Sequence, residues 1–492
     1  MKVSVIIPVQ NEQDTIGAVL EEVIKLNPFE VIVIVNGSTD KTKEIVDSYN
    51  CTILSVDQAL GNDIGRALGA KQATGDILLF LDGDISIPHN QLIPFITSIQ
   101  SGYDIALNDL SFLAFQKYCP HYTTVSKLVV NTYLKKSNLT LNSLLAVPHT
   151  MKREAVHKIG WENLADPVLA QAIAIKKGLK FCSPCLVDVI KTNRIRPIHS
   201  QFDPKSAFPK TTNRIIGDHL RAISYLTLCD GVRGGFPGTV PSGILSRNPS
   251  YDLSEVQRKS KYSAIISITN ECPFVEYTVN QLKLAGVDDL ILVAEKGVKD
   301  IISNINVKEA IVLELDRHSD LKSMRLAGAK KATGDICLFL NGNQPIQAEE
   351  IKLFFEAVEN GADVALHNRQ RLLDSFNPYD SISIGQYFVN MASHRPDLFN
   401  SGLSFLPFAI NKKVFEAHGN DVFMVPPLAQ IKLMFEGFKV KSITTKKLGH
   451  YNQFLNTQEV LGDQLEALSC LIKLTDERGG FSDGDRRRKF LQ

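Results

Sequence analysis

An internal repeat constrains the fold of this chain more than any other feature of its sequence. Residues 66–84 have the sequence RALGAKQATGDILLFLDGD, and residues 325–343 have the sequence RLAGAKKATGDICLFLNGN. Thirteen of these 19 aligned positions are identical, which is too many for a chance match between two amphipathic segments. The same offset of 259 residues pairs LAQ at 169–171 with LAQ at 428–430. We therefore expect two domains of one fold in tandem.

A later block repeats at an offset of 245 residues, pairing GDHL at 217–220 with GDQL at 462–465. Between the two halves lies a segment rich in Pro, Ser, Gly and charged residues, a composition typical of linkers. The predicted boundaries are 1–247 for the first domain, 248–261 for the linker and 262–492 for the second domain.

Composition and charge exclude several classes of protein. Apolar residues make up 44% of the chain and charged residues 22%, which is typical of globular proteins, and the formal net charge of +1 gives no basis for a nucleic-acid partner. The basic tail at 486–489 is expected to be a solvated end. The sequence contains neither the 18 or so consecutive apolar residues of a membrane helix nor a signal-peptide pattern. We expect a cytoplasmic protein, or one peripheral at a membrane.

Apolar runs and helical periodicity alternate along the first half. Continuous apolar runs predict buried strands at 3–7, 31–35, 52–55 and 77–81. Helical spacing of apolar residues predicts helices at 14–25, 39–49 and 64–73. This alternation predicts an α/β fold with a mostly parallel sheet that is flanked by helices. A further helical pattern surrounds His219, which we expect on a helix surface.

Three polar clusters follow the predicted strands: QNE at 10–12, NGSTD at 36–40 and DGD at 82–84. Because ligands of α/β sheets bind beyond the carboxyl ends of the strands, these clusters are expected to converge on one site. Asp82 and Asp84 carry hard oxygen ligands that suit Mg or Mn completed by substrate phosphates. Such an ion would neutralise the charge on a diphosphate leaving group. The alternative for DGD is a polar turn.

The NGSTD cluster joins a predicted strand to a predicted helix. Its small residues would let a base or ribose lie against the backbone, and a helix N-terminus favours anionic groups. A simple helix cap is the alternative. Arg66, at the start of the helix before DGD, is a candidate phosphate contact, although its counterpart Arg325 in the second half equally suggests a structural ion pair.

The ordered motifs of the first half resemble family 2 glycosyltransferases of the GT-A fold. They are PxxNExxxI from Pro8, NGSTDKT from Asn36, and GxxxGRxxGAxxAxGDxxxFLDGD from Gly61. The resemblance is close over the first 90 residues and looser beyond them. It implies two tandem, Rossmann-like GT-A domains and a hexosyltransferase-type enzyme. The donor would be a nucleoside-diphosphate sugar, commonly a UDP-sugar, and the acceptor a glycan or small molecule. The chain departs from the family at Val35-Asn36, where Asp-Asp is common.

The resemblance also implies roles for individual residues. The expected contacts to the nucleotide sugar are Pro8, Gln10, Glu12, Asn36, Gly37, Ser38, Arg66 and Asp82. Asp82 and Asp84 would hold the divalent cation, Mn or Mg, with His199 as a further candidate ligand. The candidates for a catalytic base on the acceptor side are Asp109, Asp166 and His149, and the sequence leaves this choice open.

The second half keeps the residues that carry the fold and lacks those that carry the chemistry. The replaced positions are Asp82 by Asn341, Asp84 by Asn343, Asp109 by Asn368, His149 by Phe408 and Asp166 by Val425. Neutral amides are poorer ligands for a hard dication than carboxylates. We predict a degenerate, non-catalytic second domain that serves packing, homo-oligomer formation or acceptor binding.

Two rival functions remain. A sugar nucleotidyltransferase would have a Gly-rich basic loop after the first strand, where this chain has PVQNE at 8–12. A non-catalytic nucleotide-sugar-binding or scaffold protein would not need the intact DGD and NGSTD clusters of the first half. The absence of a GxGxxG motif after the first strand argues against a nicotinamide enzyme. A role in polysaccharide biosynthesis is the expectation at the level of the family.

Overall fold

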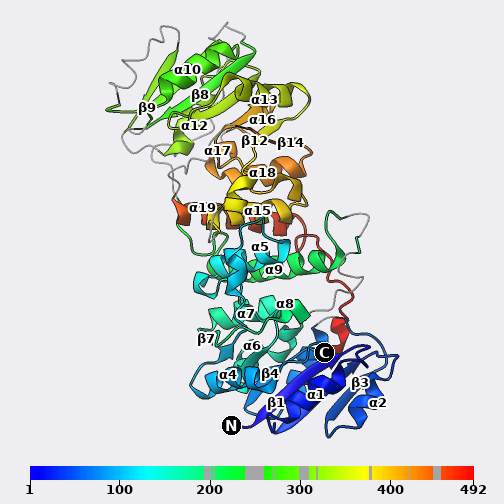
Figure 1. Cartoon of the computed structure of the whole chain (residues 1–492). Coiled ribbons are helices and arrows are strands. Elements are labelled where there is room, and N and C mark those ends of the chain that lie inside the picture. The colour runs from blue at the N-terminus through cyan, green and yellow to red at the C-terminus, as the bar shows by residue number, and fades with distance from the viewer. Residues whose placement is uncertain are drawn as a thin grey trace. The chain divides into compact units, whose positions relative to one another are not determined.

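The computed structural model forms two compact units, each built around a seven-stranded, mostly parallel sheet flanked by helices (Figure 1). The first unit comprises Met1–Gly234, Asn377–Ser381 and Ile472–Gln492, and the second comprises Gly235–Phe376 and Ile382–Leu471. The prediction of an α/β fold with mostly parallel sheets is confirmed. The structure describes residues 1–61, 63–192, 201–202, 206–238, 260–269, 272–298, 310–316, 320–375, 379–419, 421–446 and 456–491.

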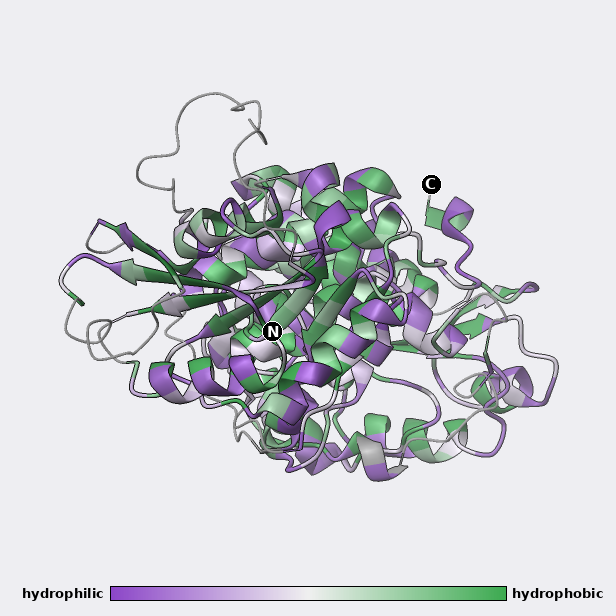
Figure 2. Ribbon diagram, turned by 90° about the horizontal axis from the view of Figure 1, so that it is seen from above, coloured by the Kyte–Doolittle hydropathy of each residue, from purple (hydrophilic) through white to green (hydrophobic). Residues whose placement is uncertain are grey.

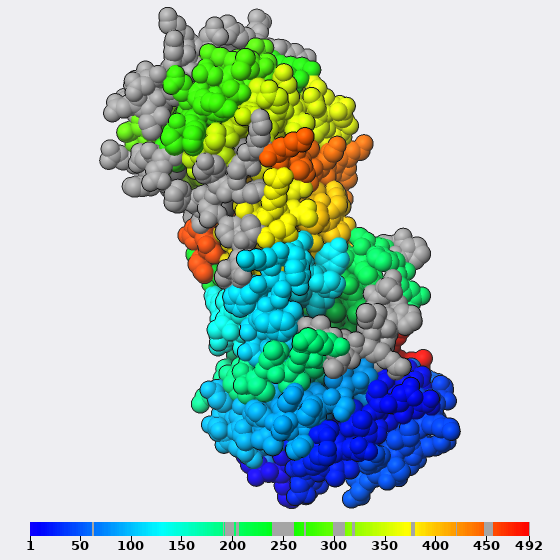
Figure 3. Space-filling model, viewed as in Figure 1, coloured from blue at the N-terminus to red at the C-terminus, as the bar shows by residue number. Residues whose placement is uncertain are grey.

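The C-terminal segment Ile472–Gln492 belongs to the first unit, whereas the predicted boundaries assign it to the second domain. The C-terminus lies beside the first sheet in Figure 1, and the red C-terminal atoms border blue N-terminal atoms in Figure 3. The basic tail within this segment is not a solvated end, because the side chain of Arg486 is fully buried. Most of the predicted linker, 248–259, lies outside the described residues.

Strands and helices of the first unit alternate as predicted. The strands are β1 (Val3–Val9), β2 (Glu30–Asn36), β3 (Thr52–Val56), β4 (Ile77–Phe80), β5 (Ile105–Ala106), β6 (His149–Lys152) and β7 (Phe181–Cys182). The α-helices are α1 (Ile16–Ile24), α2 (Thr42–Asp47), α3 (Ile64–Gln72), α4 (His89–Gln100), α5 (Tyr122–Tyr133), α6 (Arg153–Ile159), α7 (Pro167–Lys176), α8 (Val189–Thr192) and α9 (Lys210–Asp230). The strand order is β3-β2-β1-β4-β6-β5-β7, and β6 is antiparallel to both of its neighbours.

The first sheet is buried on both faces, as its continuous apolar strands require. Ile6 and Ile34 pack on one face with residues of α3 and α7, and Val5 and Val33 pack on the other with residues of α1 and α4. Figure 2 colours the ribbon by hydropathy, and strands in it are green, the hydrophobic end of the scale, over much of their length. This packing holds the carboxyl ends of β1, β2 and β4 in fixed positions. Among the described helices, none combines the length and apolarity needed to cross a bilayer.

The second unit has the same strand order and the same pairing directions as the first, position by position: β10-β9-β8-β11-β13-β12-β14, with β13 antiparallel to both neighbours. Its strands are β8 (Tyr262–Ile268), β9 (Asp289–Glu295), β10 (Ile311–Leu315), β11 (Ile336–Asn341), β12 (Val364–His367), β13 (Phe408–Asn411) and β14 (Val440–Ile443). Its helices are α10 (Val275–Leu284), α12 (Leu321–Ala329), α13 (Ala348–Glu359), α14 (Gln370–Ser375), α15 (Ser381–Ala392), α16 (Lys412–His418), α17 (Asp421–Met424), α18 (Pro426–Phe435) and α19 (Thr457–Leu474).

Buried side-chain contacts also repeat between the units. In the first unit Gln171 Nε2 donates a hydrogen bond to Asn131 Oδ1 at 2.8 Å. In the second unit Gln430 Nε2 donates to Asn390 Oδ1 at 2.7 Å. Residues that are 259 positions apart in the sequence therefore occupy equivalent places in the two units.

Candidate functional site

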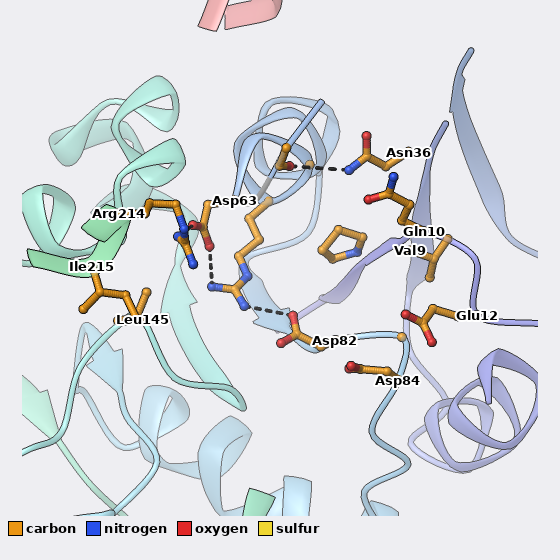
Figure 4. A pocket seen from close by; sticks show the side chains of 15 residues that line it. Val9, Gln10, Glu12, Asn36, Asp63, Asp82, Asp84, Leu145, Arg214 and Ile215 are labelled. Atoms are coloured by element: carbon orange, nitrogen blue, oxygen red, sulfur yellow. Dashed lines mark hydrogen bonds and ion pairs between the residues drawn. The ribbon is translucent and has the colours of Figure 1, made fainter. Parts of the chain in front are cut away.

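A pocket of about 280 Å³ opens in the first unit at the carboxyl ends of β1, β2 and β4 (Figure 4). This is the edge at which parallel α/β sheets bind ligands. The structure brings most of the predicted contacts onto its wall: Pro8, Gln10, Glu12, Asn36, Arg66, Asp82 and Asp84. The pocket is also lined by Asp63, Leu145, Arg214 and Ile215, which belong to none of the predicted clusters.

Alternating charges form one side of this pocket. Arg66 Nη2 contacts Asp82 Oδ1 at 2.8 Å, and Arg66 Nη1 contacts Asp63 Oδ1 at 3.0 Å (Figure 4). Asp63 Oδ2 in turn contacts Arg214 Nη1 at 3.0 Å. Burial opposes ionisation of Asp63, but the charges of Arg66, Arg486 and Arg214 outweigh it and lower its pKa to about 2. Asp63 is therefore an anion at neutral pH that holds two cationic side chains at the pocket wall.

Asp82 and Asp84 lie on either side of Gly83 just after β4, and Glu12 extends toward the same part of the pocket (Figure 4). Within the described residues, no three His, Cys, Asp or Glu side chains are grouped closely enough to hold a metal ion by themselves. Mg and Mn commonly bind one or two carboxylates and take their other ligands from water and substrate phosphates. The residues present thus fit a cation that is completed by a diphosphate. His199 lies outside the described residues.

Gly37 and Ser38, both predicted to contact the nucleotide, lie behind the pocket wall rather than on it. Gly37 has a φ of 63°, and an added Cβ would lie 2.4 Å from the Ala59 nitrogen, so the position requires glycine. Ser38 Oγ accepts a hydrogen bond from Asn11 N at 3.1 Å, and Asn11 Oδ1 accepts one from Thr39 N at 2.8 Å. The loop after β2 therefore supports the loop after β1.

Asn36 ends β2 and connects two parts of the pocket. Its Oδ1 accepts a hydrogen bond from Leu60 N, and its Nδ2 donates to the Gly61 carbonyl at 3.4 Å (Figure 4). The side chain is buried, with 7% of the residue exposed. Asn36 thus fixes the segment before α3 in addition to lining the pocket.

Two of the three candidate bases lie in buried surroundings and not on the wall of this pocket. His149 stacks on Phe80 with ring centroids 4.8 Å apart, and burial lowers its pKa to about 3. Asp166 caps the N-terminus of α7 and contacts Arg221 Nη1 at 3.3 Å. Burial, together with the charge of Asp218, raises the pKa of Asp166 to about 6. The structure therefore does not bring His149 or Asp166 together with the polar clusters.

A second pocket of about 540 Å³ adjoins the first, and the two share Asp82, Asp84 and Leu145. Its wall is mostly apolar, with Leu110, Leu113, Leu141 and Val147 among its residues. Asp109, the third candidate base, immediately precedes the wall residue Leu110. Burial works against ionisation of Asp109, but hydrogen bonds from Ser111 and Asn142 outweigh it and lower its pKa.

Besides Asp82 and Asp84, α5 and its N-cap contribute polar groups to the second pocket. His121 is the N-cap of α5, where its Nδ1 accepts a hydrogen bond from Thr123 N at 3.3 Å. Lys127, one turn into the helix, lines the pocket, and burial lowers its pKa to about 8. Neither His121 nor Lys127 belongs to a motif with recognisable spacing, so the sequence alone does not point to them.

The fold and the pocket define the first unit as an α/β domain with a mostly parallel sheet and an Asp-Gly-Asp turn at the edge where such sheets bind ligands. Residues 4–150 match the family described as Glycosyl transferase family 2. The chain thus contains a glycosyltransferase family 2 domain, as its motifs predicted.

Three curated relatives illustrate the match. Glycosyltransferase AglE of Haloferax volcanii is 41% identical over 114 residues, which is 21% of this chain and 37% of that protein. Undecaprenyl-phosphate 4-deoxy-4-formamido-L-arabinose transferase of Serratia proteamaculans is 29% identical over 115 residues, 21% of this chain and 35% of that protein. Glucosyl-3-phosphoglycerate synthase of Mycolicibacterium paratuberculosis is 33% identical over 106 residues, 19% of this chain and 32% of that protein. The matched segment therefore spans at most 37% of the length of any of these three relatives.

Among solved structures, the chain is similar to glucosyl-3-phosphoglycerate synthase from Mycobacterium tuberculosis in complex with Mn²⁺, UDP and glucosyl-3-phosphoglycerate. The TM-score is 0.35 and the sequence identity 18%, with 45% of this chain and 79% of that chain covered.

Proposed function

We propose that the protein is a glycosyltransferase whose first unit moves a sugar from a nucleoside-diphosphate sugar, most simply a UDP-sugar, to an acceptor with the help of a divalent cation. The observation that carries this proposal is the convergence of three sequence clusters, those after β1, β2 and β4, on one pocket. The family 2 domain at residues 4–150 supports the same activity.

The wall residues divide into groups with different chemistry. Pro8, Gln10 and Asn36 lie at the ends of β1 and β2 and would hold the nucleoside. Arg66 and Arg214 would place positive charge beside the diphosphate, for which guanidinium groups are well suited. Asp82 and Asp84 would hold Mn or Mg, which when bound neutralises charge on the departing diphosphate.

The second pocket is the proposed acceptor site, because it shares the two aspartates of the donor pocket. Its apolar wall and the cationic Lys127 favour an acceptor with an apolar portion and an anionic group. The name of one relative includes undecaprenyl phosphate, a compound of this kind. Of the three candidate bases, Asp109 is next in sequence to a wall residue of this pocket, and we propose it as the base. General base catalysis contributes about 10²- to 10⁴-fold, so Asp109→Asn should reduce turnover by that order and leave UDP affinity unchanged.

Isothermal titration calorimetry of the full chain with UDP, GDP and TDP tests the donor site. We expect UDP to bind in the presence of Mn and to bind weakly in excess EDTA. The absence of binding across all three series, with Mn and with Mg, would refute the proposed function. Turnover is then followed as UDP release from a panel of UDP-sugars, with farnesyl phosphate, farnesol and 3-phosphoglycerate as acceptor probes. Lys127→Gln should raise KM for the anionic probes without changing the affinity for UDP.

The same assays separate the rival functions. A sugar nucleotidyltransferase would release pyrophosphate from a nucleoside triphosphate and a sugar 1-phosphate. A non-catalytic binding protein would bind the nucleotide sugar and release no UDP with any acceptor.

The second unit is, in this proposal, a degenerate copy of the first that performs no transfer and serves as a packing or oligomer interface. Asn341 Oδ1 accepts a hydrogen bond from Asn343 N at 3.2 Å, so the DGD position has become a neutral polar turn. Arg325 donates hydrogen bonds to the carbonyls of Leu403 and Ser404 at 3.4 Å each, whereas its counterpart Arg66 forms ion pairs with two aspartates. We therefore expect titration to saturate at one nucleotide per chain, and two equivalent sites would contradict this assignment.

A further inference from the structure

The last residues of the chain form part of the structure around the donor pocket. Phe490 and Leu491 pack against the same apolar cluster as Ile34 and Ile64. Arg487 N donates a hydrogen bond to the Leu60 carbonyl at 2.9 Å, and the Leu60 amide is bonded to Asn36. The segment that follows the whole second unit thus returns to the backbone between β3 and α3.

Gly61, a wall residue of the pocket, shows how closely this segment approaches. Its φ is 81°, and an added Cβ would lie 2.5 Å from the carbonyl oxygen of Asp485. A side chain at position 61 would therefore clash with the backbone of the C-terminal segment. Only glycine satisfies both the backbone conformation and this contact.

Arg486 connects the C-terminal segment to the charges of the pocket. Its Nη1 and Nη2 bind the two carboxylate oxygens of Asp218 at 2.6 and 2.8 Å, in a bidentate pair. Its Nη2 also donates to Asp63 Oδ2 at 2.7 Å. The side chains of Arg486 and Asp218 are both fully buried. One guanidinium group thus joins α9 to the residue that precedes α3.

Asp63 depends on this contact for its position. Its φ of 66° lies in the left-handed region, which costs free energy for a non-glycine residue and persists where the surroundings hold it. The two carboxylate oxygens of Asp63 have different partners: Oδ1 contacts Arg66, and Oδ2 contacts Arg214 and Arg486. Without Arg486, both Asp63 and the buried Asp218 lose a close cation.

We propose that Arg486 is a positioning residue of the donor pocket, and that the C-terminal segment sets the affinity of the first unit for the diphosphate of its donor. Arg486 does not line the pocket. It acts through Asp63, which orients Arg66 and Arg214 on the pocket wall. This inference rests on the proposed function for the identity of the ligand, and on the contacts above for the role of the segment.

The test compares Arg486→Gln with Arg488→Gln in the full chain. Arg488 is a matched control, because it binds Asp483 at 2.5 and 2.9 Å and lies 3.6 Å from Asp166, neither of which lines the pocket. Binding of UDP with Mn is measured by calorimetry and stability by thermal unfolding. We expect Arg486→Gln to raise the Kd roughly 10- to 100-fold, the range seen when residues that orient metal ligands are replaced, because Asp63 holds Arg66 and Arg66 contacts Asp82. Arg488→Gln should lower Tm and leave the Kd unchanged.

Hydrogen–deuterium exchange of the ligand-free variants provides a readout that does not depend on the donor. Arg486→Gln should increase exchange of the amides from 60 to 66 more than Arg488→Gln does. Guanidinium chloride at low millimolar concentration, with sodium chloride as control, should partly restore UDP binding to Arg486→Ala. Equal Kd values for Arg486→Gln and wild type, or equal exchange at 60–66 in both variants, would overturn the inference. Wild-type protein that binds no nucleotide would overturn only the proposed function.

Discussion

Replacing Asp82 and Asp84 one at a time by asparagine tests whether the DGD segment holds a metal ion or is only a polar turn. Asp82 is already ion-paired to Arg66 at 2.8 Å, with 33% of its side chain exposed. Asp84 lies on the other side of Gly83 and also lines the pocket. We expect Asp82→Asn to affect both stability and donor binding, because it removes the charge that pairs with Arg66. Asp84→Asn tests donor binding.

The contacts of Arg66 set the size of the stability effect. An amide oxygen at position 82 still accepts a hydrogen bond from Arg66, so the variant loses the charge and keeps the contact. Hydrogen bonds to charged groups contribute about 1.5–3 kcal/mol and neutral ones about 0.5–1.5 kcal/mol, which leaves a difference of about 1 kcal/mol. Partial exposure of Asp82 makes this an upper value. For a domain of this size the difference corresponds to a decrease in Tm of about 2–4 °C.

The effect on binding should be larger than the effect on stability. Loss of one charged metal ligand at about 1.5–3 kcal/mol corresponds to a roughly 10- to 100-fold weaker Kd for UDP in the presence of Mn. Differential scanning fluorimetry gives Tm, and calorimetry with Mn or with EDTA gives the metal-dependent part of the affinity. An Asp84→Asn protein that binds UDP as tightly as wild type with Mn would show that the Asp-Gly-Asp segment is only a turn, and the metal role would be withdrawn.

Two further predictions use the buried titratable groups. His149→Phe should keep the stack on Phe80 and normal turnover. Because the pKa of His149 is lowered to about 3, the unfolded chain takes up a proton near pH 6.5 that the folded protein does not, and wild-type stability therefore decreases below that pH. Urea unfolding at pH 7 and pH 5 should show a smaller decrease for His149→Phe than for wild type. Lost turnover in this variant would make His149 catalytic. The raised pKa of Asp166, about 6, has the opposite sign: the folded protein binds the extra proton between about pH 4 and 6, so this group makes stability decrease as pH rises through that window. Urea unfolding of Asp166→Asn should lack this decrease in stability between about pH 4 and 6. A pH dependence equal to that of wild type would contradict the raised pKa of Asp166.

Local sequence patterns predicted the elements around the site well, because the strands there are buried on both faces. The apolar runs at 3–7 and 77–81 became β1 and β4 with small changes at their ends. The strand β7 has two residues, too few for any periodicity, and it exists because β5 pairs with it. Convergence of the polar clusters followed from topology alone, since the carboxyl ends of parallel strands share one edge.

The buried charges near the pocket could not be predicted in this way. Amphipathic spacing placed His219 on a helix surface, and that prediction is wrong, because the residue is 1% exposed. Helical periodicity finds apolar faces, and it cannot distinguish a polar face in water from one that meets buried partners. Arg486 was assigned to a solvated end because a short charge run at a terminus is usually solvated. Its partners Asp63 and Asp218 are more than 260 residues away in sequence, and no local pattern links them.

The repeat itself contains a signal for this charge cluster. Asp63 and Arg214 form an ion pair at 3.0 Å in the first unit. The positions 259 and 245 residues later hold Lys322 and Glu459, which form an ion pair at 2.6 Å with the two signs exchanged. If the charge of only one residue of the pair were reversed, two like charges would lie in contact at a half-buried position. Both charges are therefore reversed in the second unit, and an ion pair is kept at the same place.

The third member of each cluster differs between the units. Asp463, the counterpart of Asp218, is bound by Lys322 itself at 2.8 Å, so the second unit supplies a cation to this carboxylate from its own α12. In the first unit that position is Asp63, a second anion, and the cation comes from Arg486 in the C-terminal segment. The unit that contains the donor pocket is thus the one whose charge balance depends on the end of the chain. If the cation beside Asp218 served packing alone, a lysine at position 63 could supply it, as Lys322 does in the second unit. The use of Arg486 instead favours a role for this residue in the pocket.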